Sequence, residues 1–324
     1  MEKRLEVIDM LRGLAALSVC WYHMTISYPA GSMIKAISKY GWLGVEVFFV
    51  ISGFIIPYIL FHSGYQLKNY FHIFMFKRLI RLYPPYLIAV ALVLVLWHLS
   101  AIAPGFKGIN PEHSTAQILL HLGYLNDIIG YPWFNPVFWT LAIEFQYYLL
   151  ISLLYPLVVS ESDQYRRIGM VILCLLPVLA DSKAYVVGYL GLFSLGILTF
   201  QYFRKLISYM EYLIMFMLAS AGLIMSLGIL IAIIGMTTAL VIGFLKINVS
   251  KIFIFLGTIS YSLYLVHVPV GSRVVHLGQR IASTELENLF ISLFGVIVSI
   301  AFASIFYIYI EKPSRAWSAK IKYI

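Results

Sequence analysis

Long apolar runs cover nearly the whole of this chain, and they constrain its fold more than any other feature. Of its 324 residues, 61% are hydrophobic and only 11% are charged, whereas a soluble domain usually carries about 25% charged residues. A single soluble core cannot bury this much apolar surface. The runs are continuous rather than alternating, which favours membrane-spanning helices over a β-barrel.

We divide the apolar runs into ten predicted spans, using about 20 helical residues as the length that crosses the hydrocarbon core; the fifth span is short. We therefore predict an all-α, polytopic membrane protein in which residues 1–324 form a single domain within the lipid bilayer. No internal repeat and no appended soluble domain are evident. The predicted spans are 6–28, 41–62, 79–101, 136–158, 167–181, 184–203, 209–227, 229–246, 252–272 and 288–311.

Lysines and arginines are distributed unevenly between the two sides of these spans. Sixteen of the 23 fall on the side of the N-terminus, six fall on the opposite side, and Arg12 lies within the first span. Cytoplasmic loops are enriched in Lys and Arg, so both termini are expected in the cytoplasm. The same bias accounts for the net charge of +9 without a nucleic-acid partner.

The first span and the cysteines limit how the chain is processed. The first apolar stretch is long, carries charged groups and lacks an obvious cleavage site, so we expect it to be retained rather than removed as a signal peptide. Cys20 and Cys174 are the only cysteines, and both lie in apolar segments. A disulfide framework is therefore excluded.

The first span includes IDMLRGLAALSVCWYH, Ile8 to His23, which contains three ionisable side chains. Arg12 and His23 are eleven residues apart, close to three helical turns, so they lie on one face and roughly 16 Å apart along the axis. Asp9 precedes Arg12 by about one turn and can pair with it. Arg12 could instead extend to the lipid headgroups, whereas His23 is too short to do so and is a candidate functional residue.

Three further ionisable residues are expected in the outer half of the membrane, near the depth of His23. Glu46, Glu144 and His267 come from three other predicted spans, and their distances from the ends of those spans set their depth. A histidine beside a carboxylate is a general acid–base arrangement. The alternatives are polar groups that merely join helices and a metal site. No ligand-spacing signature is present, so no metal is expected.

A basic cluster lies at the predicted cytoplasmic face, in KRLIRLYPPY from Lys77 to Tyr86. Arg78 and Arg81 are about one turn apart and point to one side of the helix. Two fixed guanidinium groups suit a phosphate. Ordinary anchoring of the helix at the cytoplasmic face explains them equally well.

Residues 102–135 form the longest predicted connection, and they lie on the outer face. Long loops in compact proteins are often binding loops or lids. Within the connection, STAQILLHLGYLNDIIG (114–130) resembles a short amphipathic or re-entrant helix. The aromatic residues of the connection could stack on a sugar or form an interfacial belt; they are Tyr124, Tyr131, Trp133 and Phe134.

Five segments, in this order along the chain, resemble those of membrane acyltransferase family 3, a family of integral-membrane O-acyltransferases. They are the Arg-x10-His spacing of Arg12 and His23, GVEVFFVISGFII (44–56), RLIRLYPPY (78–86), FWTLAIEFQYYLL (138–150) and ISYSLYLVHVPV (259–270). Two positions depart from the family pattern. Phe145 follows Glu144 where many members have a second glutamate, and Met10 replaces a glycine.

The resemblance implies an O-acyltransferase that takes an acyl group, commonly acetyl from acetyl-CoA, and delivers it to a hydroxyl group of a carbohydrate or another acceptor. Arg12, Arg78 and Arg81 would hold the CoA phosphates. His23 would act as a general base or as a transient acyl carrier, and Glu144 would orient it. Further candidates for positioning the substrates are Asp9, Glu46, Asn135, Tyr264 and His267.

The resemblance also implies a multi-pass protein of the plasma membrane, which in bacteria is the inner membrane. Some relatives carry a C-terminal hydrolase-like domain. This chain shows none, so we expect it to act alone on its acceptor. A proton-coupled transporter or flippase is the main alternative, because it too would need histidines and glutamates near the middle of the membrane.

Overall fold

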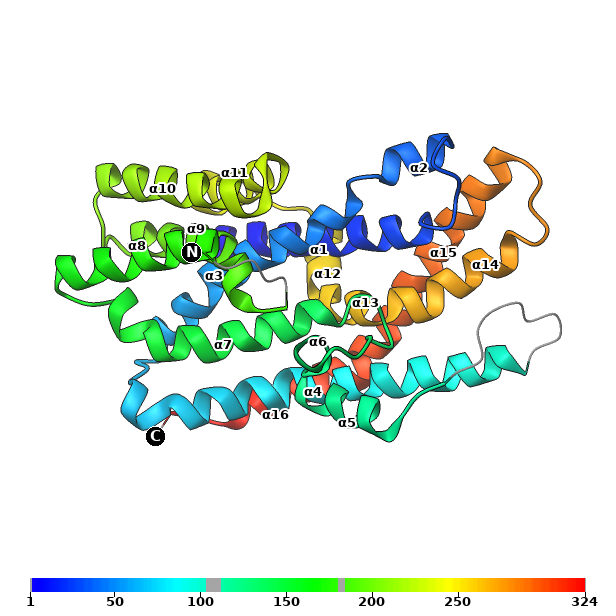
Figure 1. Ribbon diagram of the computed structural model, residues 1–324, viewed down its shortest axis with the longest axis horizontal. Helices are drawn as coiled ribbons and strands as arrows, with labels where there is room; N and C mark the ends of the chain where they lie inside the picture. The colour runs from blue at the N-terminus through cyan, green and yellow to red at the C-terminus, as the bar shows by residue number, and fades with distance from the viewer. Residues whose placement is uncertain (1, 103–111, 180–183, 324) are drawn as a thin grey trace.

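The computed structural model describes residues 2–102, 112–179 and 184–323, with side chains from residue 6 onward. The structure is 81% helical and has no strand in the described residues, which confirms the predicted all-α fold. The long helices run side by side as a bundle (Figure 1). The start of α1 (Glu2–Met24) and the end of α16 (Lys312–Lys320) lie towards the same end of that bundle.

Each of the ten predicted spans coincides with one or more helices. Besides α1, the long helices are α3 (Gly44–His62), α4 (Leu67–Ala101), α7 (Trp139–Val158), α8 (Asp163–Leu179), α9 (Leu190–Phe203), α10 (Tyr209–Leu227), α11 (Ile229–Phe244) and α15 (Glu285–Phe306). The short ones are α2 (Met33–Ser38), α5 (Thr115–Gly123), α6 (Asn126–Ile129), α12 (Lys251–Thr258), α13 (Ser260–Val266) and α14 (Arg273–Gly278), besides α16.

The predicted number of ten membrane spans is not confirmed. Among the described residues, six helical stretches are long and apolar enough to cross a membrane, and one bent pair raises the number to seven. The six are Met33–His62, Leu67–Ala101, Trp139–Val158, Val186–Phe203, Tyr209–Leu227 and Glu285–Lys320. Helices α8 and α11 are shorter, with 17 and 16 residues. Helix α1 is long enough, but its ionisable residues reduce its apolar character.

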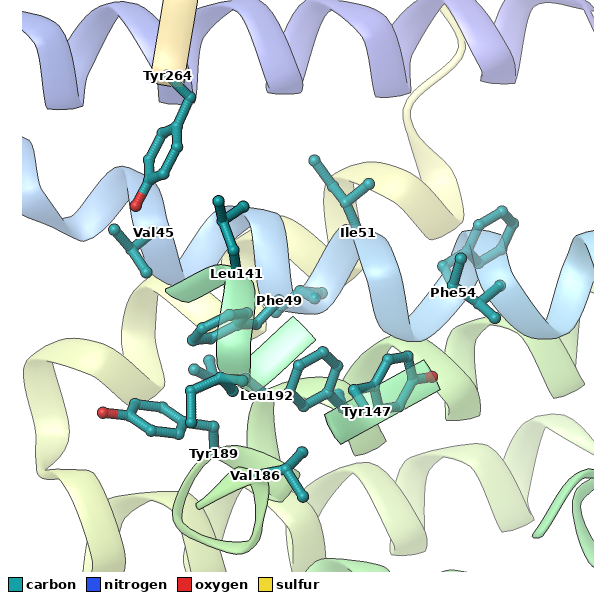
Figure 2. Packing of buried hydrophobic residues seen from close by; sticks show 14 of the residues in the cluster. Val45, Phe49, Ile51, Phe54, Leu141, Tyr147, Val186, Tyr189, Leu192 and Tyr264 are labelled. Atoms are coloured by element: carbon teal, nitrogen blue, oxygen red, sulfur yellow. The ribbon is translucent and has the colours of Figure 1, made fainter. Parts of the chain in front are cut away.

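Helices α3 and α9 form the centre of the bundle. In the stretches that contain them, Met33–His62 and Val186–Phe203, the most apolar 18 residues are 78% and 83% buried. The corresponding share is at most 50% in the other four candidate spans. A Cβ atom at Gly53 would lie only 2.2 Å from the carbonyl oxygen of Phe193, so the two backbones touch. Small residues at crossings allow membrane helices to pack this closely. The Phe49 ring packs next to this crossing, with its centroid 5.0 Å from that of the Phe193 ring. Figure 2 shows Phe49 among the buried side chains of the core.

The ninth predicted span is a broken helix. Helix α12 and the following stretch Ser260–Gly278 meet at an angle of 55°. A π-helical turn, His267–Ser272, interrupts the second stretch. Such turns are frequent at functional sites. The break and the turn bring Ser260 and His267 to fully buried positions in the bundle.

The described part of the long outer connection, residues 112–135, contains α5 and α6; residues 103–111 lie outside the described residues. The predicted amphipathic helix corresponds to α5, capped by Ser114. His121 ties the segment together, because its Nδ1 is 2.8 Å from the carbonyl oxygen of Gln117 and its Nε2 accepts the Phe134 N–H at 3.1 Å. Burial lowers the pKa of His121, in keeping with a neutral ring that accepts at Nε2. We interpret His121 as a structural residue.

Candidate active site

A cavity of about 280 Å³ lies between α1, α3, α4, α7 and α13. We call it the inner cavity, because Arg12, nearer the start of α1 than His23, lines it. Arg78 and Arg81 line it as well. The structure therefore brings together the three arginines that the sequence placed in one binding site.

These arginines present positive charge to the inner cavity. Arg12 pairs loosely with Asp9, whose Oδ1 is 3.9 Å away. Arg78 is buried, with its guanidinium 5.3 Å from the ring centre of Phe74 and 5.2 Å from that of Tyr148. Neither Arg78 nor Arg81 has a carboxylate within ion-pair distance in the described part of the chain. Both guanidinium groups can therefore take an anionic ligand.

Glu144 lines the inner cavity and is not positioned as the sequence predicted. Its Oε1 accepts hydrogen bonds from Ser52 Oγ at 3.0 Å and from the hydroxyl of Tyr148. The side chain that contacts the ring of His23 is the imidazole of His267 rather than the carboxylate of Glu144. The expected pairing of Glu144 with His23 is therefore not observed, and Glu144 instead organises the wall of the inner cavity.

A second cavity, of about 510 Å³, adjoins the first and contains His23. We call it the outer cavity. Glu46 lines it and is 4% exposed, and its Oε2 has no hydrogen-bond partner among the described residues. Aromatic side chains form much of the remaining wall: Tyr22, Trp42, Trp139 and Tyr189. An unpartnered buried carboxyl oxygen in the cavity that His23 also lines indicates a site for a hydrogen-bond donor.

His23 and His267 form a hydrogen-bonded pair whose proton positions follow from their neighbours. Nδ1 of His267 is 2.9 Å from the carbonyl oxygen of Leu263, which can only accept, so this nitrogen carries a proton and Nε2 accepts. Nδ1 of His23 lies 3.2 Å from that Nε2 and 2.9 Å from the carbonyl oxygen of Val19. Both neighbours accept, so His23 is protonated at Nδ1. Its Nε2 is then the basic nitrogen.

Two further predicted residues have structural partners of their own. Tyr264 lines both cavities, and its hydroxyl is 2.8 Å from Thr140 Oγ1. Asn135 is buried, donates to the carbonyl oxygen of Leu265 at 3.3 Å and accepts from the Val137 N–H at 3.3 Å. Asn135 lines neither the inner nor the outer cavity. Its observed contacts join the outer connection to α13 and the start of α7.

Sequence reasoning missed several residues of the inner cavity. Glu311 is buried there, accepts from the Ser262 N–H and hydroxyl, and lies 3.8 Å from Arg315. It is an ionisable residue at the edge of a predicted span, the signal that singled out Glu46. Tyr148 is four residues after Glu144 and therefore shares its helix face. Ser52 carried no comparable signal.

No group of three or more His, Cys, Asp or Glu side chains that could hold a metal ion occurs in the described ranges. A sequence model of the acyltransferase 3 family, described as an acyltransferase domain, matches residues 5–308. The chain belongs to the acyltransferase 3 family. This confirms the resemblance that the five segments indicated.

Curated relatives of this family member are matched over shorter stretches. The chain is 32% identical over 157 residues to the peptidoglycan O-acetyltransferase OatA of Listeria monocytogenes and 30% identical over 165 residues to the O-acetyltransferase OatA of Staphylococcus aureus. These matches cover 46% and 47% of the chain and 24% of each relative. A protein of Acidianus two-tailed virus, with the provisional name acetyltransferase ORF330, is 34% identical over 153 residues, 46% of the chain and 41% of the relative.

The chain thus spans less than half the length of these relatives in the matched regions. No solved structure matches the chain. Family membership and the apolar helices together identify a multi-pass membrane protein.

Proposed function

We propose that this acyltransferase 3 family member is a membrane O-acetyltransferase that moves an acetyl group from acetyl-CoA to a hydroxyl group of a carbohydrate. One observation carries the proposal: the inner cavity with its arginines and the outer cavity with His23 share two wall residues, Val45 and Tyr264. A donor held on one side can therefore meet an acceptor on the other. Membership of an acyltransferase family favours this enzyme over a proton-coupled transporter.

The inner cavity suits the donor. CoA carries several phosphates, and guanidinium groups bind phosphate oxygens through charge-assisted hydrogen bonds. Arg78 and Arg81 lie about one helical turn apart on α4, and Arg12 faces the same space from α1. The roughly 16 Å between Arg12 and His23 along α1 is the length over which an extended donor would reach from its phosphates towards its thioester.

The histidine pair supplies the proton transfer. Nε2 of His23 takes the proton of the acceptor hydroxyl, and the hydroxyl oxygen attacks the thioester carbonyl carbon. When the tetrahedral intermediate collapses, the carbon–sulfur bond breaks, and the departing CoA thiolate receives the proton back from His23. His267 accepts the Nδ1 hydrogen of His23 throughout and so holds the ring in the reactive tautomer.

The outer cavity suits a sugar. Its aromatic walls can cover the apolar face of a sugar ring, and the free oxygen of Glu46 can accept a hydrogen bond from a neighbouring hydroxyl. The name of the Listeria relative, a peptidoglycan O-acetyltransferase, supports a carbohydrate polymer as acceptor. Such an acceptor lies outside the cytoplasm, which supports the plasma membrane as the location.

The arginines provide the test of the donor site. Replacing Arg78 and Arg81 together by alanine should weaken acetyl-CoA binding by at least about 100-fold, because each hydrogen bond to a charged group contributes about 1.5–3 kcal/mol. Arg167→Ala is the matched control, since Arg167 is an exposed arginine paired with Glu211. Isothermal titration calorimetry of the purified protein measures the affinity. An unchanged affinity in the double variant would return both arginines to the role of topology anchors.

A further inference from the structure

Two residues line both cavities and form the part of the wall that the cavities share. Val45 of α3 and Tyr264 of α13 are the residues that line both the inner and the outer cavity. Both are buried, at 8% and 5% exposure. If the donor occupies the inner cavity, as proposed above, its acyl group has to lie between these two side chains when the acceptor hydroxyl reaches it from the outer cavity.

The Tyr264 side of this wall is held in place. The Tyr264 hydroxyl is 2.8 Å from Thr140 Oγ1 and 3.4 Å from the carbonyl oxygen of Val137, both at the start of α7 or just before it. The ring packs edge-on against Phe48 at a centroid distance of 5.8 Å. Swinging the ring aside would break these contacts in a buried environment.

The Val45 side is also fixed, because α3 cannot move away. A Cβ atom at Gly44 would lie 2.4 Å from the carbonyl oxygen of Ala15, so α3 touches the backbone of α1 next to Val45. On its other side α3 touches α9 at Gly53. Val45 itself is β-branched and therefore restricted at χ1. Figure 2 shows Tyr264 extending from its helix towards Val45 across this narrow space.

We propose that Val45 and Tyr264 form a constriction that selects an acetyl donor over donors with longer acyl chains. The inference rests on the proposed function, because it assumes that an acyl-CoA lies in the inner cavity. Protein interiors are close-packed, and additional methylene groups force neighbouring atoms out of position. A butyryl chain would place two more methylene groups than an acetyl group between or next to these two fixed side chains.

Binding of acyl-CoA by the purified protein tests the constriction without an acceptor. The wild-type protein should bind acetyl-CoA at least about ten-fold more tightly than butyryl-CoA, since overpacking a fixed site by two methylene groups weakens binding by about this factor. Val45→Ala should reduce the ratio to about two-fold or less by raising the affinity for butyryl-CoA. Val50→Ala is the matched control, because Val50 is a buried valine of the same helix that lines neither cavity.

Each outcome is decisive. Equal wild-type affinities, or an unchanged ratio in Val45→Ala, would overturn the constriction and leave the proposed function intact. Failure of the wild type to bind either acyl-CoA would overturn the proposed function and the constriction with it. If Val45→Ala does not fold, Thr140→Val releases the Tyr264 hydroxyl and should raise the relative affinity for butyryl-CoA; no rise would overturn the constriction.

Discussion

At the residue scale, the proposed acetyl transfer depends on the pair formed by His23 and His267. His267 has its own proton directed to the carbonyl oxygen of Leu263 and so presents an acceptor nitrogen to His23. A carboxylate partner would add a negative charge and stabilise the imidazolium strongly. A neutral imidazole partner instead fixes the tautomer with little added charge. His23 therefore depends on His267 for orientation more than for basicity.

His267→Leu should lower kcat by about 10- to 100-fold and leave the KM for acetyl-CoA unchanged, because the base loses its orientation while the donor site is intact. His267→Gln should recover a large part of kcat, since the side-chain amide oxygen can accept the Nδ1 hydrogen of His23. Steady-state kinetics of the two variants measures both constants. Equal activity of the leucine and glutamine variants would show that His267 only fills space.

Glu144 shows what depth in the membrane can and cannot predict for single residues. The distance from the end of a span gave an outer-half position for His23, Glu46, Glu144 and His267. The structure brings His23 and His267 into contact and places Glu46 in the outer cavity, which His23 also lines. Glu144 faces the other cavity, because the direction in which a side chain points depends on helix rotation and packing, which a residue count along one span does not contain.

At the scale of elements, the close crossing of α3 and α9 positions both cavities. The residues of α3 on one side line the cavities, and its glycine side lies against α9. The broken helix supplies Tyr264 from α13 and His267 from the π-helical turn that follows α13. The sequence predicted one straight span there. Its break is not encoded by a proline or a charge at Ile259, so hydropathy alone could not reveal it.

Gly53→Ala should destabilise the protein by about 1–3 kcal/mol, because the added methyl group would meet the carbonyl oxygen of Phe193 at 2.2 Å in the most buried part of the bundle. Gly31→Ala is the control, since nothing lies within 4 Å of a Cβ atom at Gly31. Denaturation of the two variants in detergent micelles measures the difference. Similar stability of both variants would mean that α3 and α9 do not pack as closely as described.

At the scale of the whole molecule, the sequence predicted the all-α membrane fold better than the number of spans. Helices lie at each of the ten predicted spans, yet in the part of the chain that the structure describes only six or seven helical stretches are long and apolar enough to cross a membrane. Helix α1 is the instructive case, because Asp9, Arg12 and His23 make it too polar by composition. All three residues line the cavities: Asp9 and Arg12 line the inner one, and His23 lines the outer one.

The two-cavity arrangement could not be predicted from the sequence. Spacing along α1 placed Arg12 and His23 on one face, but the cavities are formed by side chains from several helices that are far apart in the chain. Their arrangement follows from how these helices pack. In the proposed function, this arrangement gives each of the two residues a separate task, Arg12 towards the donor and His23 towards the acceptor.

Transfer of labelled acetyl from acetyl-CoA to carbohydrate by the His23→Ala variant tests the central claim most directly. In proteoliposomes loaded with a chitin oligosaccharide, the rate of acetyl transfer should fall by about 10²- to 10⁴-fold in this variant, because the base is removed. Acetyl-CoA affinity should remain within about three-fold, because His23 lines only the outer cavity. His62→Ala, which lines neither cavity, should retain activity. Full transfer by a folded His23→Ala variant would contradict the account.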